Sequence, residues 1–264
     1  MGLFLATNDR QREIAHTAYG IVREKISVIG QVWHERLRKF REQFSSADSR
    51  RALKLSHRFS FVLAYDASAV MRGAYACREQ YETTGVLIQL AARHPKLAVV
   101  TKPHPVHRRG FLEEQIARAD LKNVFVIDKE ESPAHWLNSA HLLVTKASTL
   151  VLEAMLLDRP VLSVLLDRED NYKIFGDAVE YFYETECLFH FIEGLLNRQS
   201  AYAAWADAQI SRQREYLEQY FPPTAETPAD LAVTALCRAL AEFAHIEATA
   251  VLCPKARLVR SHSK

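Results

Sequence analysis

Residues 141–165 read HLLVTKASTLVLEAMLLDRPVLSVL, and this stretch contains the pattern that decides the fold. The runs at 141–145 and 160–165 are short and apolar, which is typical of buried strands. Between them, residues 148–157 have the apolar spacing of a helix. Because two parallel strands need a long crossover connection, strand, helix and strand in this order indicate one unit of a parallel sheet.

The same alternation continues on both sides of this stretch. Further strands are predicted at 25–30, 59–65, 97–101 and 124–127. Helices are predicted at 9–24, 33–55, 72–93, from about 111, and at 133–138. After residue 185 the pattern changes to helices alone, at 187–197, 199–219 and 229–247. The sequence therefore predicts an α/β fold, a Rossmann-like parallel sheet flanked by helices, with an all-helical C-terminal segment.

Composition excludes several classes of protein. The 264 residues carry 34 basic and 32 acidic side chains, a formal net charge of +2, which argues against a general nucleic-acid binder. No apolar run approaches the ~18 residues of a membrane span, so no integral membrane segment is expected. The four cysteines are scattered without a CxxC pair, which favours free thiols in a reducing cytoplasm over a zinc site.

Residues 98–105, AVVTKPHP, raise the first question about chemistry. A buried strand usually ends in residues that turn easily, but here it ends in Lys102 and His104, each followed by a proline of fixed φ. Such a turn is well suited to holding a cation and an imidazole in place, since His104 can donate to a phosphate oxygen or act as an acid. The alternative is a turn with an incidental cation and a surface histidine.

A second polar segment follows the strand at 141–145. Ser148 or Thr149 is expected at the helix N-cap, with Lys146 before it and Glu153 about one turn inside the helix. An N-cap offers unsatisfied N–H groups and the positive end of the helix dipole to a phosphate. Taken alone, this stretch favours simple capping, which stabilises any helix by roughly 1 kcal/mol. Taken with AVVTKPHP, it predicts two neighbouring strand ends that form a single pyrophosphate pocket.

Four pieces in this order resemble the C-terminal half, which binds the nucleotide-sugar donor, of GT-B glycosyltransferases. They are KISVIGQVWHERL (25–37), VVTKPHP (99–105), the stretch 123–164 and the late helices. The similarity spans about residues 20–240. It is greatest to bacterial capsule polysaccharide enzymes, polysialyltransferase-like proteins and glycerophosphotransferases that use CDP-glycerol.

The resemblance implies a role for each candidate residue. His104 would be catalytic and would face the donor diphosphate together with Lys102. Ser148 and Thr149 would bind that diphosphate, with Lys146 adding charge. Glu153 would hold the ribose.

The chain departs from the family pattern in two places. Lys-Ala-Ser-Thr (146–149) stands where relatives often have an acidic residue and paired serines. TAETPADLA (224–232) lacks the Asp-Gly that often opens the last helix.

The domain organisation expected from the resemblance has four parts. Residues 1–30 are a remnant of a first domain or a linker, and residues 31–185 form the Rossmann-like donor-binding domain. Residues 186–250 are helices that pack on it, and 251–264 form a flexible tail. A GT-B enzyme usually has its acceptor site in the first domain, so this chain is expected to hold only the donor half.

The leading hypothesis is a metal-independent glycosyltransferase or glycerophosphotransferase-like domain of surface polysaccharide biosynthesis. Its expected partners are a nucleotide-activated sugar or alcohol of the CMP, CDP or UDP type as substrate, a glycan acceptor, and a partner chain or second copy. No cofactor or metal is expected, and the location is cytoplasmic or peripheral to the inner membrane. Two alternatives remain open: a truncated, non-catalytic nucleotide-binding or partner subunit, and a nucleotide-sugar epimerase.

Overall fold

The computed structural model describes residues 3–67, 73–103, 111–128, 131–146, 148–166, 173–222 and 226–252. The chain divides into two compact units, one of residues 36–219 and one that combines residues 1–35 with 220–264. Each unit is described by itself below.

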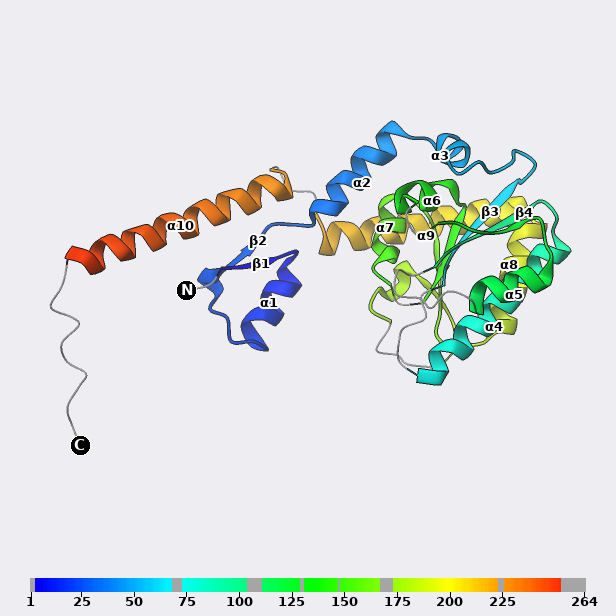
Figure 1. The fold of residues 1–264 in the computed structure, drawn as a ribbon, viewed down its shortest axis with the longest axis horizontal. Coiled ribbons are helices and arrows are strands. Elements are labelled where there is room, and N and C mark those ends of the chain that lie inside the picture. The colour runs from blue at the N-terminus through cyan, green and yellow to red at the C-terminus, as the bar shows by residue number, and fades with distance from the viewer. Residues whose placement is uncertain are drawn as a thin grey trace. The chain divides into compact units, whose positions relative to one another are not determined.

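The larger unit contains a β-sheet, which includes the labelled β3 and β4 (Figure 1). Its six strands have the order β5-β4-β3-β6-β7-β8. The strands are β3 (Phe61–Ala67), β4 (Leu97–Pro103), β5 (Val124–Val126), β6 (Leu142–Thr145), β7 (Val161–Val164) and β8 (Glu180–Phe182). Every pair of neighbours is parallel, so all six carboxyl ends lie along one edge of the sheet. β3 is buried along its whole length because it has a neighbour on each side.

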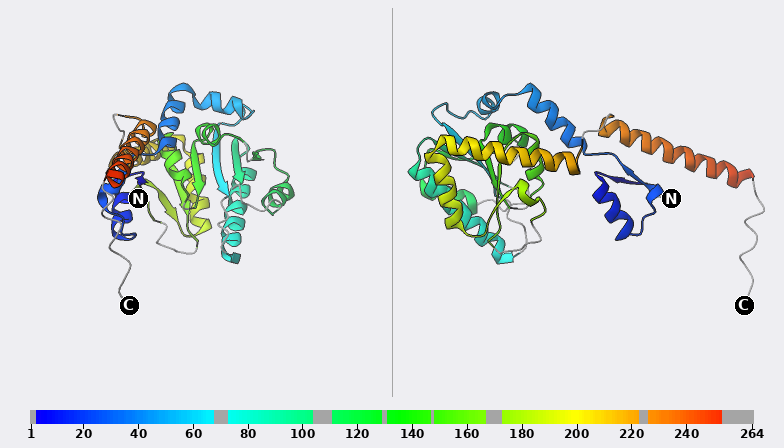
Figure 2. Two further views of the ribbon diagram at one scale, coloured as in Figure 1. Left: turned by 60° about the vertical axis from the view of Figure 1, so that its left-hand side comes forward. Right: turned by 180° about the vertical axis from the view of Figure 1, so that it is seen from behind.

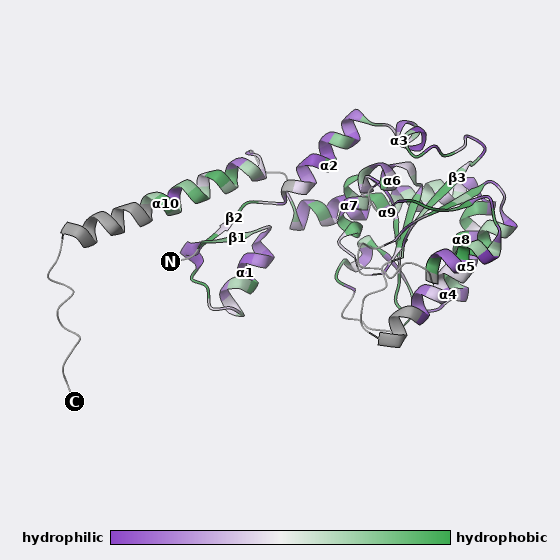
Figure 3. Cartoon of the chain, viewed as in Figure 1, coloured by the Kyte–Doolittle hydropathy of each residue, from purple (hydrophilic) through white to green (hydrophobic). Residues whose placement is uncertain are grey.

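Helices cover both faces of this sheet, as Figure 2 shows. They are α2 (Val32–Gln43), α3 (Ser46–Ala52), α4 (Gly73–Arg93), α5 (Phe111–Ala119), α6 (Pro133–Ser139), α7 (Leu150–Leu156), α8 (Thr185–Asn197) and α9 (Gln199–Tyr220), with a short 3-10 helix at Gly176–Ala178. A core cluster joins alternate residues of the strands to α4 and α8. Figure 3 accordingly shows the strands mostly in the hydrophobic colour and much of α2 in the hydrophilic one.

The smaller unit is built around a parallel pair, β1 (Phe4–Ala6) and β2 (Ile26–Val28). The helix α1 (Asp9–Thr17) and a 3-10 helix, Arg23–Lys25, connect these strands, and the unit also contains α10 (Pro228–Leu252). Gly30 has φ +77°, and a Cβ there would lie 3.3 Å from Cγ of Pro228. The positive φ therefore favours glycine at this position, and the space beside Pro228 is tight for any larger residue.

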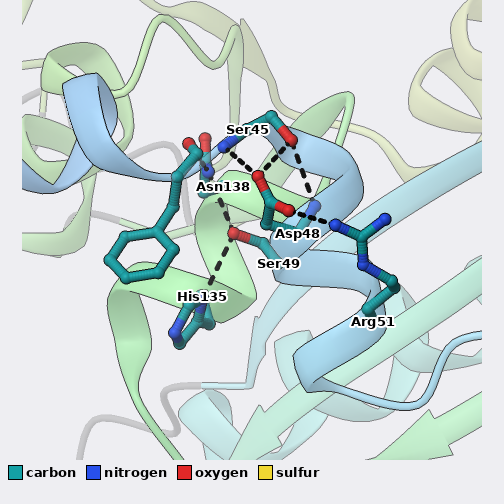
Figure 4. A network of polar contacts seen from close by, with 7 residues as sticks. Ser45, Asp48, Ser49, Arg51, His135 and Asn138 are labelled. Carbon is teal, nitrogen blue, oxygen red and sulfur yellow. Dashed lines mark hydrogen bonds and ion pairs between the residues drawn. The ribbon is translucent and has the colours of Figure 1, made fainter.

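The structure confirms the predicted α/β fold with its parallel sheet and helical C-terminal segment. The predicted helix 9–24 instead ends at Thr17. The predicted helix 33–55 is two helices, because Ser45 and Asp48 form a capping box that starts α3 (Figure 4).

Figure 4 also shows how α3 is attached to α6. The Ser49 hydroxyl lies 3.2 Å from Nδ1 of His135 and accepts a hydrogen bond from Nδ2 of Asn138 at 2.9 Å. A serine beside a histidine resembles a nucleophile with its base. Ser49 is completely buried, however, so this contact is structural.

Candidate functional site

The carboxyl ends of β4, β3 and β6 bring polar side chains to one edge of the sheet. Asp66 of β3 is the register partner of Lys102 of β4, and Thr145 is the last residue of β6. The prediction that the ends of β4 and β6 are neighbours is wrong, because β3 lies between them. The two predicted segments still share an edge, but they are separated by the width of β3.

Asp66 connects the end of β3 to the end of β6. Its carboxylate accepts a hydrogen bond from the Thr145 hydroxyl at 2.9 Å, and both side chains are buried. A hydrogen bond to a buried carboxylate is stronger than one between neutral groups. This contact therefore fixes the separation of the two strand ends.

Lys102 lies in the second-to-last position of β4 and is 8% exposed. Its ammonium donates to the carbonyl oxygens of Asp128 at 3.2 Å and Glu131 at 3.0 Å. Burial lowers the pKa of Lys102, and the acidic side chains of Asp128 and Glu131 oppose that shift. These hydrogen bonds join the end of β4 to the segment that leads into α6.

Lys146, directly after β6, forms a buried ion pair with Glu79 of α4 at 3.0 Å. Beside it, the Tyr65 hydroxyl accepts a hydrogen bond from Thr84 and donates one to the carbonyl of Gln80, both at 3.4 Å. Burial strongly raises the pKa of Tyr65, so the phenol keeps its proton. Lys146 thus reaches α4, whereas Lys102 contacts the segment before α6.

The start of α7 carries the predicted hydroxyl groups. The Ser148 hydroxyl accepts a hydrogen bond from the Leu150 amide at 3.3 Å, which is the expected capping contact. Thr149 precedes the helix in αR conformation and makes no side-chain capping hydrogen bond. Glu153 lies in the first turn and is half-buried. The phosphate and ribose roles of these residues stay predictions.

Three of the charged or polar residues at this edge were not anticipated from the sequence, and one predicted residue cannot be placed. His104 lies outside the described residues. Asp66 ends an apolar strand just as Lys102 does, so the same signal could have identified it. Glu79 and Tyr65 carry no such signal, because Glu79 stands within a helix and Tyr65 reads as a core aromatic.

Three general features of the described residues bear on chemistry. None of their helices is both long and apolar enough to cross a bilayer. Within the same residues, no group of three or more His, Cys, Asp or Glu side chains is arranged to hold a metal ion. Cys187 and Cys237 are exposed free thiols.

No family model matches the sequence, and no curated protein matches it either. Solved structures do resemble the fold. UDP-GlcNAc 2-epimerase from Neisseria meningitidis, bound to UDP-GlcNAc, is 16% identical with a TM-score of 0.58, over 89% of this chain and 61% of that one. The wall teichoic acid polymerase TagF, soaked with CDPG, is 15% identical with a TM-score of 0.62, over 90% and 57%.

A third structure, S. aureus MnaA with UDP, is 14% identical with a TM-score of 0.54, over 80% of this chain and 53% of that one. The chain therefore spans 53–61% of the length of these three structures. The epimerase and TagF are enzymes of the GT-B fold, and the likeness shows that this chain shares part of that fold. The resemblance inferred from the sequence is thus confirmed for the fold.

Proposed function

We propose that this chain is the nucleotide-binding part of a GT-B-type transferase that uses a nucleotide-activated sugar or alcohol. The observation that carries the proposal is the carboxyl edge of the parallel sheet, where the ends of β4, β3 and β6 bring together charged and hydroxyl side chains. Ligands of open parallel sheets bind beyond these ends. The solved structures of this fold that hold UDP-GlcNAc, UDP or CDPG support a nucleotide as the ligand.

In this proposal the donor diphosphate lies against the start of α7. Ser148 and Thr149 offer hydroxyl groups to it, and Glu153, farther along the helix, holds the ribose. Lys102 and Lys146 contribute positive charge from the ends of β4 and β6. His104 donates to the departing diphosphate as the catalytic residue.

Fixed hydrogen-bond donors stabilise the charge that develops on a leaving group without reorganising. The hydrogen bonds of Lys102 and the ion pair of Lys146 with Glu79 hold these two cations in place before any ligand arrives. Preorganisation of this kind is the chemical role that we assign to the edge.

The proposal extends to the domain organisation. In this proposal residues 31–185 form the donor-binding domain, and residues 1–30 belong to a first domain or linker. The acceptor is a glycan of bacterial surface polysaccharide synthesis, and the reaction takes place on the cytoplasmic side.

Calorimetry with CMP, CDP and UDP tests this proposal. We expect one of these nucleotides to bind and to raise the melting temperature, because a ligand of the native state stabilises it. Ser148→Ala removes a hydrogen bond to a charged group and should weaken binding by about ten-fold, or ~1.5 kcal/mol. His104→Ala should weaken it as well.

Ser211→Ala, an exposed serine in α9, is the matched control and should leave the affinity unchanged. The proposal is wrong if no pyrimidine nucleotide produces heat. It is also wrong if a nucleotide binds equally well to the Ser148→Ala and His104→Ala variants.

An epimerase is the second candidate, favoured by the likeness to UDP-GlcNAc 2-epimerase. Incubation with UDP-GlcNAc in the absence of an acceptor separates the two activities. Conversion to an altered sugar without any added acceptor would identify an epimerase. Sugar transfer that requires an added glycan would identify the transferase.

A further inference from the structure

A cavity of about 470 Å³ lies at the amino ends of β3, β4 and β6, within the larger unit. Its lining includes Phe61 and Leu97, the first residues of β3 and β4. The end of α8 and the start of α9 contribute Leu196 and Tyr202. The volume is that of a small-molecule site. Because the strands are parallel, this cavity and the carboxyl edge lie at opposite ends of the sheet.

One wall of the cavity is a rigid aromatic group. The rings of Phe61 and His141 are stacked with centroids 4.5 Å apart and an interplanar angle of 14°. Tyr202 meets the Phe61 ring edge-on at 5.0 Å, and its hydroxyl donates to the carbonyl of His141 at 2.7 Å. Such a wall offers flat apolar surface that loses little conformational entropy when a ligand binds.

This wall carries no charge near neutral pH. Burial, with the nearby cations of Arg50 and Arg159, lowers the pKa of His141 to about 4. Burial raises the pKa of Tyr202 to about 12. Nδ1 of His141 also accepts a hydrogen bond from the Val62 amide at 2.9 Å, which fixes the orientation of the ring.

The rim of the cavity is basic. Arg93 and Lys96 are exposed there, and Arg93 pairs with the carboxylate of Glu193 at 3.1 Å. Lys96 forms no ion pair within the part of the chain that the structure describes. The backbone amide of Phe61 already donates to the carbonyl of Lys96, and the amide of Leu97 donates to the carbonyl of His94. These two amides therefore cannot replace the cations as donors to a bound anion.

We propose that this cavity is a second binding site, for a small organic anion with a flat apolar body. The body packs between the Phe61–His141–Tyr202 wall and Leu196, and one carboxylate or phosphate group meets Lys96 and Arg93 at the rim. Both parts are needed, because one cation on a surface binds weakly and an apolar wall alone does not select an anion. This site does not depend on the nucleotide site.

NMR titration of the full chain tests the proposal with four probes: phenyl phosphate, benzoate, benzyl alcohol and inorganic phosphate. We expect the two aromatic anions to bind more tightly than either the neutral alcohol or phosphate alone. Their shifts should centre on residues 60–61, 94–97, 141 and 196–202. Lys96→Ala should weaken the binding of phenyl phosphate about three- to five-fold, and added salt should weaken it too.

Gln199→Trp places a bulky side chain from the exposed first residue of α9 into the cavity and should abolish binding. Lys122→Ala, at an exposed lysine outside the cavity lining, is the matched control. The proposal fails if phenyl phosphate binds no better than benzyl alcohol, or if Lys96→Ala and Gln199→Trp bind it as the unmodified chain does. Shifts confined to the carboxyl edge would also overturn it. Failure to bind any nucleotide would overturn the proposed function alone.

Discussion

His141 is a histidine whose surroundings hold it in the neutral state. Its ring is partly buried against Phe61, two guanidinium groups lie near it, and its Nδ1 already accepts the Val62 amide. Adding a proton would place a third cation in this group and would remove that acceptor. The folded state therefore resists protonation, although the unfolded chain does not.

The unfolded histidine titrates near pH 6.5 and the folded one near 4. Between these values the unfolded state binds a proton that the folded state does not. Stability therefore falls as the pH is lowered from about 6.5 to about 4, and this residue contributes a loss of ~3 kcal/mol. Urea unfolding at several pH values measures this loss. His141→Gln should reduce it, since an amide can accept from Val62 without titrating.

His57→Gln, at an exposed histidine, is the control and should retain the full loss of stability with falling pH. If His141→Gln and the unmodified chain lost the same free energy of unfolding between pH 6.5 and pH 4, burial of His141 would not cause the effect.

At the candidate site, the sequence identified residues that follow a predicted strand, because ligands of parallel sheets bind beyond the strand ends. Lys102 and Ser148 each follow a buried apolar run, and the chain places both at the carboxyl edge. Asp66 and Glu79 could not be paired with Thr145 and Lys146 in this way. Asp66 is 79 residues from Thr145 in the sequence, and Glu79 is 67 residues from Lys146. Only the order of the strands in the folded sheet brings the two residues of each pair together.

At the scale of single elements, a capping contact decides where α3 begins. The Ser45 hydroxyl accepts from the Asp48 amide at 3.1 Å, and the Asp48 carboxylate accepts from the Ser45 amide at 2.9 Å. These two bonds satisfy amide groups that the first turn leaves without partners. They also explain why one amphipathic stretch forms two helices.

Ser45→Ala should destabilise the protein by ~1 kcal/mol, because the N-cap acceptor is lost. Chemical denaturation would detect this as a lower urea midpoint with an unchanged slope. Ser211→Ala, in the middle of α9, should cause no loss, since alanine is the better helix former there. An unchanged midpoint in Ser45→Ala would mean that the capping box does not stabilise α3.

Apolar runs made most strands predictable, and β1 and β8 are the two described strands that were not predicted. β3, β4, β6 and β7 are continuous buried runs, and each lies within about two residues of its predicted position. β1 and β8 have only three residues each, FLA and EYF, too few for any periodicity to develop. Their partners in the sheet, not their own residues, define them as strands. β2 and β5 are equally short, but they lie inside the apolar runs 25–30 and 124–127 that predicted them.

At the scale of the whole molecule, the larger unit has what a domain needs to fold. The six strands and the main core cluster lie entirely within residues 36–219. A chain of residues 32–220, which keeps α2 and α9 intact, should therefore unfold in one cooperative transition. Circular dichroism at increasing temperature would measure it.

The midpoint of this shorter chain should lie within a few degrees of the main transition of the full chain. A gradual, non-cooperative loss of ellipticity would show instead that the larger unit depends on residues outside 32–220.

The lengths of the strands have a consequence for self-association. The sheet ends in β5 on one side and β8 on the other, and each has three residues, whereas β3 and β4 have seven. An edge strand of three residues exposes few unpaired backbone N–H and C=O groups to a strand of another molecule. Extension of the sheet by a second molecule is therefore disfavoured, and the protein is protected from the fibrous aggregation that long, open borders promote.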